Sequence, residues 1–87
     1  MKIVWHNTAW EEFTMWNEID PKTFKKIVRL IKQCARTPYE GDGKPEPLKH
    51  DLAGYWSRRI NSKDRIVYRT SNDTLEIISC KTHYGHN

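Results

Sequence analysis

Residues 55–81, YWSRRINSKDRIVYRTSNDTLEIISCK, decide the fold. Three runs rich in β-branched and aromatic residues are separated by two polar turns, at 61–64 and 71–73. Runs of this kind, bounded by turn residues, are typical of neighbouring antiparallel strands. The stretch therefore predicts a β-meander in which Arg69 faces Glu76 across the second turn. The three expected strands are 55–60, 65–70 and 75–81.

A first helix is predicted upstream of the meander, over residues 8–18. Thr8 followed by Glu11 has the spacing of a capping box, in which the two side chains close the start of a helix. Aromatic residues then recur at intervals of three, which predicts one apolar stripe along this helix. They are Trp10, Phe13 and Trp16.

A second helix is predicted to begin at Asp20-Pro21 and to run to about residue 36. Asp is a good N-cap, and Pro fits the first helical position. One face of this helix is apolar and carries Phe24, Ile27, Val28, Ile31 and Cys34. The opposite side is basic, with Lys22, Lys25, Lys26, Arg29 and Lys32, and we expect it to be a solvated face. The tight link between the two helices predicts an antiparallel helical hairpin.

The remaining segments complete an α+β domain. Residues 2–5 are apolar and β-prone, and predict a first strand. Residues 37–47 hold three Pro and two Gly, which excludes regular structure for most of this segment. A strand, a helical hairpin on one face and a meander together predict a single sheet. We expect one domain over residues 1–84 and a short extension over 85–87.

Composition narrows the class of protein further. The chain has 87 residues, a formal net charge of +4 and 37% hydrophobic residues. This length accommodates one domain, which excludes a doubly wound nucleotide fold or a barrel enzyme. Cys34 and Cys80 are too few for a disulfide scaffold, so we expect two free, buried thiols. We expect no signal peptide and no membrane span, which predicts a cytoplasmic protein without a membrane partner.

Two motifs for phosphate or metal binding are incomplete. Residues 41–44, GDGK, end in Gly-Lys, but Pro45 follows where a phosphate loop has Ser or Thr. Cys80, His83 and His86 have a spacing suited to zinc but lack an obvious fourth ligand. We therefore predict no metal and no cofactor.

Polar residues in the second half of the chain form a stronger pattern. They are Glu46, Lys49, His50, Arg58, Arg59, Arg65, His83 and Tyr84. An acid, an imidazole and several cations on one sheet face would suffice to cut RNA without a metal, by moving protons and stabilising a charged phosphorane. Each residue also has a structural interpretation: Glu46 as a solvated loop carboxylate, Arg65 as the partner of Asp64 or Asp51. The residues alone leave both interpretations open.

Four runs carry a resemblance to a known family. They are 36–50 (RTPYEGDGKPEPLKH), 52–60 (LAGYWSRRI), 65–68 (RIVY) and 80–84 (CKTHY). From residue 2 to Tyr84 the sequence resembles the YoeB (Txe/YoeB) family of toxins of bacterial type II toxin–antitoxin systems, within the RelE/ParE superfamily. The resemblance implies an α+β fold and a ribosome-dependent mRNA endonuclease. Such an enzyme enters the ribosomal A site, cuts the message there and so inhibits translation.

The resemblance also implies a role for each matched residue. Glu46 is the general base, His83 is the general acid, and Arg65 stabilises the transition-state phosphate. Residues that help to bind the message are Lys49, Arg59 and Tyr84. The implied partners are the ribosome, mRNA and a cognate YefM/Axe-like antitoxin, and family members can form homodimers. No metal or cofactor is implied.

The implied roles of Arg59 and Arg65 set a geometric condition. Direct pairing of these two residues across the 61–64 turn puts both on one sheet face. Pairing residue 60 with Arg65 puts the two arginines on opposite faces, because strand side chains alternate. We therefore predict the register that pairs Arg59 with Arg65, with a three-residue loop and a bulge.

Three functional hypotheses follow, of which the nuclease is the first. The second is a ParE-like toxin that acts on a protein target such as DNA gyrase, and the third is a passive basic RNA-binding module. Glu46, Arg65 and His83 favour the nuclease, because a toxin that does not cut RNA has no need of them. The extension 85–87 departs from the family pattern and adds a second imidazole, His86, near His83.

Overall fold

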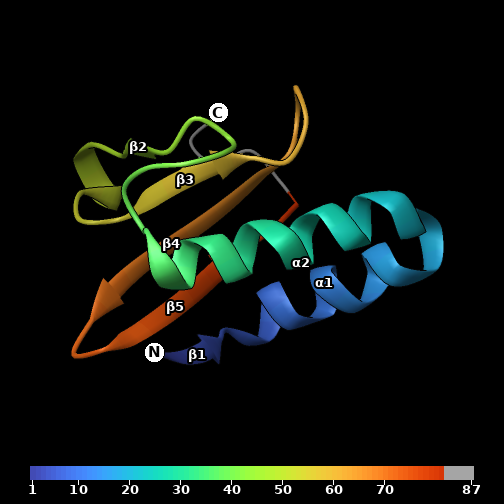
Figure 1. The fold of residues 1–87 in the computed structure, drawn as a ribbon, viewed down its shortest axis with the longest axis horizontal. Coiled ribbons are helices and arrows are strands. Elements are labelled where there is room, and N and C mark those ends of the chain that lie inside the picture. Colours follow the sequence, from blue (N-terminus) through green and yellow to red (C-terminus); the bar gives the residue numbers. More distant parts are fainter. Residues whose placement is uncertain (82–87) are drawn as a thin grey trace.

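The computed structural model describes residues 1–81 of the chain. Two helices lie side by side against one face of a five-stranded sheet (Figure 1). The helices are α1 (Asn7–Ile19) and α2 (Pro21–Arg36), and a 3-10 turn spans His50–Leu52. The strands are β1 (Lys2–Trp5), β2 (Glu46–Pro47), β3 (Trp56–Arg59), β4 (Arg65–Ser71) and β5 (Thr74–Ser79). The predicted α+β architecture, with a helical hairpin on one face, is confirmed. Neither α1 nor α2 is long and apolar enough to cross a membrane.

The sheet has the order β1-β5-β4-β3-β2. Strands β3, β4 and β5 form the predicted antiparallel meander, and each ends within two residues of its expected bounds. Arg69 pairs with Glu76 across the second turn, as predicted, and its Nε lies 2.6 Å from Oε1 of that carboxylate. β1 runs parallel to β5 at one edge of the sheet.

Helix α2 begins where the sequence predicts. The carboxylate of Asp20 accepts hydrogen bonds from the backbone N–H of Thr23 (3.2 Å) and from its hydroxyl (2.7 Å). These two bonds hold the pKa of Asp20 below its usual range, since they favour the charged form. The inward face of the helix is buried through Ile27, Leu30, Ile31 and Cys34.

The predicted capping box of α1 is wrong. The helix begins at Asn7 with His6 as its N-cap, no side chain caps it, and Thr8 lies inside the first turn. The reason is the strand before it: the backbone N–H of His6 still donates to Ile77 at the end of the β1–β5 ladder (3.0 Å). The carbonyl of His6 already accepts from Trp10 (2.9 Å), so the helix starts directly after the strand and leaves no room for a separate cap.

The aromatic stripe of α1 is buried only in part. Trp16 is buried, and its Nε1 donates to the carbonyl of Cys80 (2.8 Å). Phe13 packs against the core at its edge, with its ring 4.7 Å from that of Phe24. Trp10 is 50% exposed and meets Trp5 edge-on. A helix turn takes about 3.6 residues, so side chains spaced by three drift around the helix. The first residue of the stripe, Trp10, therefore lies away from the core.

Both cysteines are free and buried, as predicted. Burial raises the pKa of Cys34 to about 11 and that of Cys80 to about 12, because a thiolate is poorly solvated in the core. The backbone N–H of Cys80 is satisfied by the carboxylate of Glu12 on α1 (2.8 Å). The backbone of Cys80, directly after β5, is therefore tied to the first helix by side chains of α1.

The segment before β3 contains a strand that the sequence did not predict. Glu46 and Pro47 form β2, paired with Ser57 and Trp56 of β3. The ladder continues with the N–H of Leu48, which donates to the carbonyl of Tyr55 (2.9 Å). Proline lacks an N–H, and an edge strand is a place in a sheet where that loss is tolerated. The high proline and glycine content of residues 37–47 therefore gave no sign of this short strand, which fixes the position of Glu46.

Candidate functional site

Sheet register places three of the expected site residues on one face. Glu46 pairs with Ser57, and Arg59, two residues beyond Ser57 on β3, pairs with Arg65 of β4. Directly paired residues and residues two apart project to the same side of a sheet. The side opposite α1 and α2 therefore carries Glu46, Arg59 and Arg65, and is termed the outer face. The predicted register is confirmed.

The turn between β3 and β4 explains this register. The N–H of Ile60 donates to the carbonyl of Asp64 (2.9 Å), which leaves a three-residue loop at 61–63, as predicted. The side-chain oxygen of Asn61 accepts from the N–H of Lys63 (2.8 Å) and of Asp64 (2.6 Å). This Asx-type arrangement closes the loop locally. A register irregularity of the sheet lies between Val67 and Tyr68 opposite β5, rather than at this turn.

The guanidinium of Arg65 is held by neutral acceptors. Its Nη1 donates to the carbonyls of Asn61 (3.0 Å) and Asp64 (3.2 Å). Among residues 1–81, no carboxylate lies within 4 Å of this group, so the pairing with Asp64 or Asp51 that the sequence allowed is not formed. The Asp64 carboxylate instead accepts from the side-chain amide of Asn61 (3.1 Å). Arg65 is thus oriented while its charge stays available to an anion.

Glu46 and Lys49 lie at the edge of the sheet beside β3. Both are exposed, and together with His50 they line a shallow hollow of about 340 Å³. Pro45 and Pro47 flank Glu46 and fix their own φ angles, which limits the backbone motion of the carboxylate between them. Neither Glu46 nor Lys49 forms an ion pair within the described part of the chain. An acid and a cation are therefore available side by side.

Two expected site residues, His83 and Tyr84, lie outside the described residues. His86 lies outside them as well, so the Cys80-His83-His86 spacing is described at Cys80 alone. The expected site residues within the described part are Glu46, Lys49, Arg59 and Arg65, and the role of every expected site residue stays a prediction.

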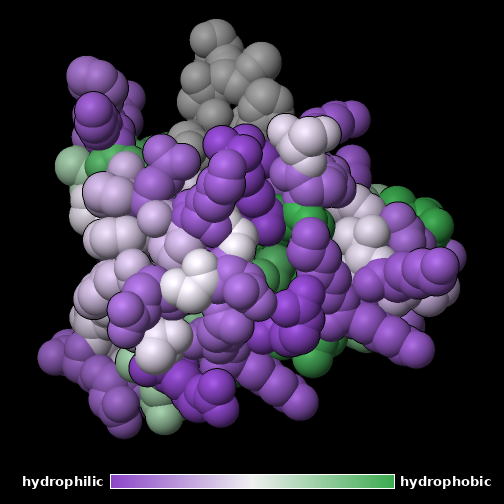
Figure 2. All heavy atoms as spheres, turned by 45° about the horizontal axis from the view of Figure 1, so that its top comes forward, coloured by the Kyte–Doolittle hydropathy of each residue, from purple (hydrophilic) through white to green (hydrophobic). Residues whose placement is uncertain are grey.

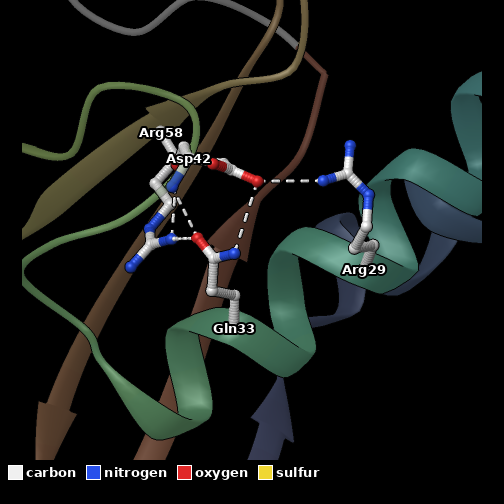
Figure 3. Close-up of polar contacts among 4 residues, drawn as sticks. All are labelled: Arg29, Gln33, Asp42 and Arg58. Carbon is white, nitrogen blue, oxygen red and sulfur yellow. Dashed lines mark hydrogen bonds and ion pairs between the residues drawn. The ribbon is translucent and has the colours of Figure 1, made fainter.

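Arg58 is not part of the outer face, contrary to the sequence interpretation that grouped it with the site cations. It pairs with Ile66 on β4, and alternation turns it toward α2, where it is fully buried. Its guanidinium donates to the phenol of Tyr68 (3.2 Å) and to three loop carbonyls. It also donates to Oε1 of Gln33 (2.6 Å), and Figure 3 shows this contact beside the one to Asp42. The three loop carbonyls belong to Thr37, Glu40 (2.8 Å) and Asp42 (3.3 Å). Arg58 is a structural residue.

The contacts of Arg58 fix the loop that leads to Glu46. Gln33 accepts from the N–H of Asp42 (2.6 Å), and the Asp42 carboxylate accepts from Arg29 (3.0 Å) and Gln33 (3.4 Å). The N–H of Arg59 donates to the carbonyl of Gly43 (2.7 Å), so the loop is also bonded to β3. At Gly43, with φ +84°, a Cβ would approach the Arg59 carbonyl to 3.0 Å, which favours glycine.

This buried network was missed at the sequence level. Gln33 lies between Lys32 and Cys34 on α2, and Tyr68 lies in a mostly apolar run of β4, so neither signals a buried partner. One signal was available, because strict alternation along β3 places adjacent arginines on opposite faces. Burial raises the pKa of Tyr68 to about 12, so the phenol stays neutral and accepts from Arg58 while donating to the carbonyl of Pro38 (2.6 Å).

Comparison with known proteins adds independent findings. A family model described as the YoeB-like toxin of bacterial type II toxin–antitoxin systems matches residues 5–84. Toxin YoeB of Escherichia coli K12 is 50% identical over 84 residues, which are 97% of this chain and all of that protein. A YoeB/ParE toxin from Agrobacterium tumefaciens is 49% identical, with a TM-score of 0.91 over 97% of this chain and all of the other.

Two solved structures from Staphylococcus aureus contain YoeB in different assemblies. The YoeB–YefM complex from Staphylococcus aureus contains a chain 41% identical, with a TM-score of 0.88, and the YoeB dimer from the same organism one 42% identical, with a TM-score of 0.89. Each alignment covers 97% of this chain and 98% of the other. With a family model over residues 5–84 and relatives matched along nearly their whole length, this chain belongs to the family of YoeB-like toxins of bacterial type II toxin–antitoxin systems.

Proposed function

We propose that this chain is an endoribonuclease toxin that cuts messenger RNA in the ribosomal A site and so inhibits translation. The observation that carries the proposal is the outer face, where Glu46, Arg59 and Arg65 project to the same side. Within residues 1–81 none of the three is neutralised by an ion pair. One carboxylate beside uncompensated cations is suited to cutting RNA. The carboxylate can take the proton of a 2′-hydroxyl, and the cations can stabilise the negative charge that develops on the adjacent phosphate.

The spacing of the outer face fits this substrate. Glu46 and Arg65 are separated by two strand spacings across the sheet and by two residues along it, so their Cα atoms lie about 12 Å apart. Long side chains that project from the same face shorten this gap. A nucleotide bound over Ser57 would present its 2′-hydroxyl to the carboxylate and its phosphate to the guanidinium.

The proposed reaction is a transesterification within the RNA. The Glu46 carboxylate takes the proton of the 2′-hydroxyl, and the 2′-oxygen forms a bond to the adjacent phosphorus. The bond from phosphorus to the 5′-oxygen breaks, and His83 gives its proton to that oxygen as it leaves. The products are a 2′,3′-cyclic phosphate and a 5′-hydroxyl, so no water, metal or cofactor enters this step.

The cations act on the charge that develops at phosphorus. Arg65 is oriented by the Asn61 and Asp64 carbonyls before substrate binds, so little reorganisation is needed when the phosphorane forms. A guanidinium presents two parallel donors to phosphate oxygens, which a lysine cannot do. Lys49 and Arg59 neutralise neighbouring phosphates, and Tyr84 completes the site by stacking on a base or orienting the scissile phosphate.

Partners of the toxin follow from the same assignment. The ribosome and its message are the target, in the cytoplasm. A YefM/Axe-like antitoxin would neutralise the toxin, which is supported by the solved YoeB–YefM complex from Staphylococcus aureus. The YoeB dimer from that organism supports a homodimer of this chain as well.

The test is cleavage of a defined message on purified bacterial ribosomes, with the 5′ ends mapped and the terminal groups identified. We expect cuts confined to the A-site codon, dependent on ribosomes, with 5′-hydroxyl ends. His83→Ala should abolish them and His86→Ala should not. If the wild type leaves the message intact but inhibits DNA supercoiling by gyrase, the ParE-like alternative replaces the nuclease. If cutting survives His83→Ala and is lost in His86→Ala, the acid is His86.

A further inference from the structure

Helix α2 carries the whole positive excess of the protein. It contains six of the 15 basic residues and none of the 11 acidic ones, so the rest of the chain has a net charge of −2. The six are Lys22, Lys25, Lys26, Arg29, Lys32 and Arg36, and all are exposed. The charge of +4 is therefore a local feature of one helix face, rather than a general property of the surface.

This face is not neutralised by its surroundings. Among residues 1–81, the Arg29–Asp42 pair is the one ion pair that involves α2, and both its side chains are more than half exposed. Like charges three and four residues apart destabilise a helix. The core contacts of Ile27 and Ile31 hold α2 in place despite this repulsion. Such an array is suited to a polyanion that supplies the missing negative charge.

Two hollows adjoin the array, and one of them reaches Arg59 of the outer face. One of about 380 Å³ runs along α2 and is lined by Lys25, Arg29, Lys32 and Arg36, together with Val28 and Gln33. Another, of about 550 Å³, has Lys26, Arg29, Lys44 and Arg59 in its lining, with one carboxylate, that of Asp42, which pairs with Arg29. The face turned to the viewer in Figure 2 is covered mostly by hydrophilic side chains. Cations therefore form a track from α2 to Arg59.

The shape of the array indicates the kind of polyanion. At a rise of about 1.5 Å per residue, the distance from Lys22 to Arg36 is about 21 Å along a straight line. Proteins that hold single-stranded RNA combine cations with exposed aromatic rings on which bases stack. The one aromatic residue of α2, Phe24, packs against the core instead. A rigid row of cations without a stacking ring matches the phosphate backbone of an A-form duplex.

We propose that the exposed face of α2 binds the phosphate backbone of double-helical RNA, beside and separate from the face that cuts the message. The proposal rests on the proposed function for its choice of RNA as the polyanion. Because ribosomal RNA is largely double-helical, this surface would hold the toxin on the ribosome while Glu46 and Arg65 act on the single-stranded message. Cutting and anchoring would then use different sides of one small domain.

The test compares two variants that each remove two positive charges. Lys25→Gln/Lys32→Gln alters the middle of α2, and Lys2→Gln/Lys63→Gln is the matched control, since all four side chains are exposed. Binding of a fluorescent 16-base-pair RNA duplex is followed by anisotropy between about 50 and 200 mM salt. The α2 variant should bind at least about tenfold more weakly, with a salt slope reduced by about two, and the control should match the wild type. Lys25→Arg/Lys32→Arg should restore binding.

Equal losses in both variants would show that net charge alone is responsible, and would overturn the proposal. Unchanged duplex binding by the α2 variant would also overturn it. If its affinity for a glutamate-rich peptide falls instead, the surface is a protein-binding site. Duplex binding is measured without cleavage, so it stands or falls independently of the nuclease assignment. On programmed ribosomes the α2 variant should raise KM about tenfold and leave kcat unchanged, whereas a loss of kcat alone would contradict an anchoring role.

Discussion

Arg58 and Arg59 are neighbours in sequence and opposites in structure. Arg58 is fully buried on the helix side of β3, where it donates to carbonyls and to Gln33 and Tyr68. Arg59 lies on the outer face, exposed and in no ion pair with residues 1–81. The same residue type therefore holds a loop on one face of the strand and, in the proposed function, meets the substrate on the other. Strand alternation, rather than residue type, separates structure from function here.

The largest expected effect is a loss of stability on replacing Arg58, the arginine on the helix side of β3. Arg58→Ala leaves the carbonyls of the loop and the Gln33 oxygen without their donor in a buried place, so we expect a loss of about 3 kcal/mol in the free energy of unfolding. Arg59→Ala, at an exposed site, should change it by less than about 0.5 kcal/mol. Urea unfolding followed by tryptophan fluorescence measures both. Equal changes for the two variants would contradict the assignment of Arg58.

The outer face should respond in activity instead. Arg65→Ala removes the guanidinium proposed to stabilise the phosphorane, so the single-turnover cutting rate on ribosomes should fall by about 10²–10³. The free energy of unfolding of Arg65→Ala should fall far less than that of Arg58→Ala. Within the described residues only two hydrogen bonds, to carbonyls of a turn at the surface, are lost, whereas Arg58 is fully buried. Arg65→Lys should recover a minor part of the rate, because an ammonium lacks the planar fork. A rate for Arg65→Ala within threefold of the wild type would remove Arg65 from the site.

The reactivity of the two buried thiols distinguishes the closed core from the exposed faces. With pKa values of about 11 and 12, Cys34 and Cys80 stay protonated at pH 8, and both are buried. Their reaction with a disulfide reagent should be at least about 100-fold slower in the folded protein than in urea. Absorbance of the released thiolate follows the reaction. A fast phase for either cysteine in the native protein would show that the core is open.

The smallest effect belongs to the edge of the outer face, at Glu76. Its carboxylate bonds His6 (2.6 Å) and Arg69 (2.6 Å), which lowers its pKa below the usual value near 4.5. Because the folded-state pKa is depressed, this stabilisation is present above about pH 4.5 and is lost as the pH falls through the lower value. Glu76→Gln should therefore be slightly less stable at neutral pH and equal to the wild type in strong acid. Parallel stability curves at all pH values would contradict this linkage.

Much of the fold was predictable from sequence because it depends on local patterns. The N-cap of α2, the three strands of the meander and the pairing of Arg69 with Glu76 follow from spacing and turn residues. The start of α1 was not predictable, since it depends on the end of the β1–β5 ladder at His6. β2 was not predicted because Pro45 precedes it and Pro47 lies within it, and its pairing with β3 leaves no signal in the local sequence.

For the candidate site, the pairing of β3 with β4 was predictable, but the hydrogen bonds of its arginines were not. The condition that Arg59 faces Arg65 could be written from sequence and is met. The carbonyls that orient Arg65 and the loop contacts of Arg58 could not be foreseen, because they join segments that are distant in the chain or backbone atoms without a sequence signature. The roles that the resemblance implies for His83 and Tyr84 stay predictions, because both residues lie outside the described residues.

The most direct test of the outer face as the cutting site is the single-turnover cutting rate of Glu46→Gln on programmed ribosomes, measured beside its free energy of unfolding. A matched control is Glu18→Gln, an exposed residue of α1. Loss of a general base should lower the rate of Glu46→Gln by about 10²–10⁴, with stability within about 0.5 kcal/mol of the wild type and the control unchanged. Cutting by Glu46→Gln within threefold of the wild type would contradict the central claim.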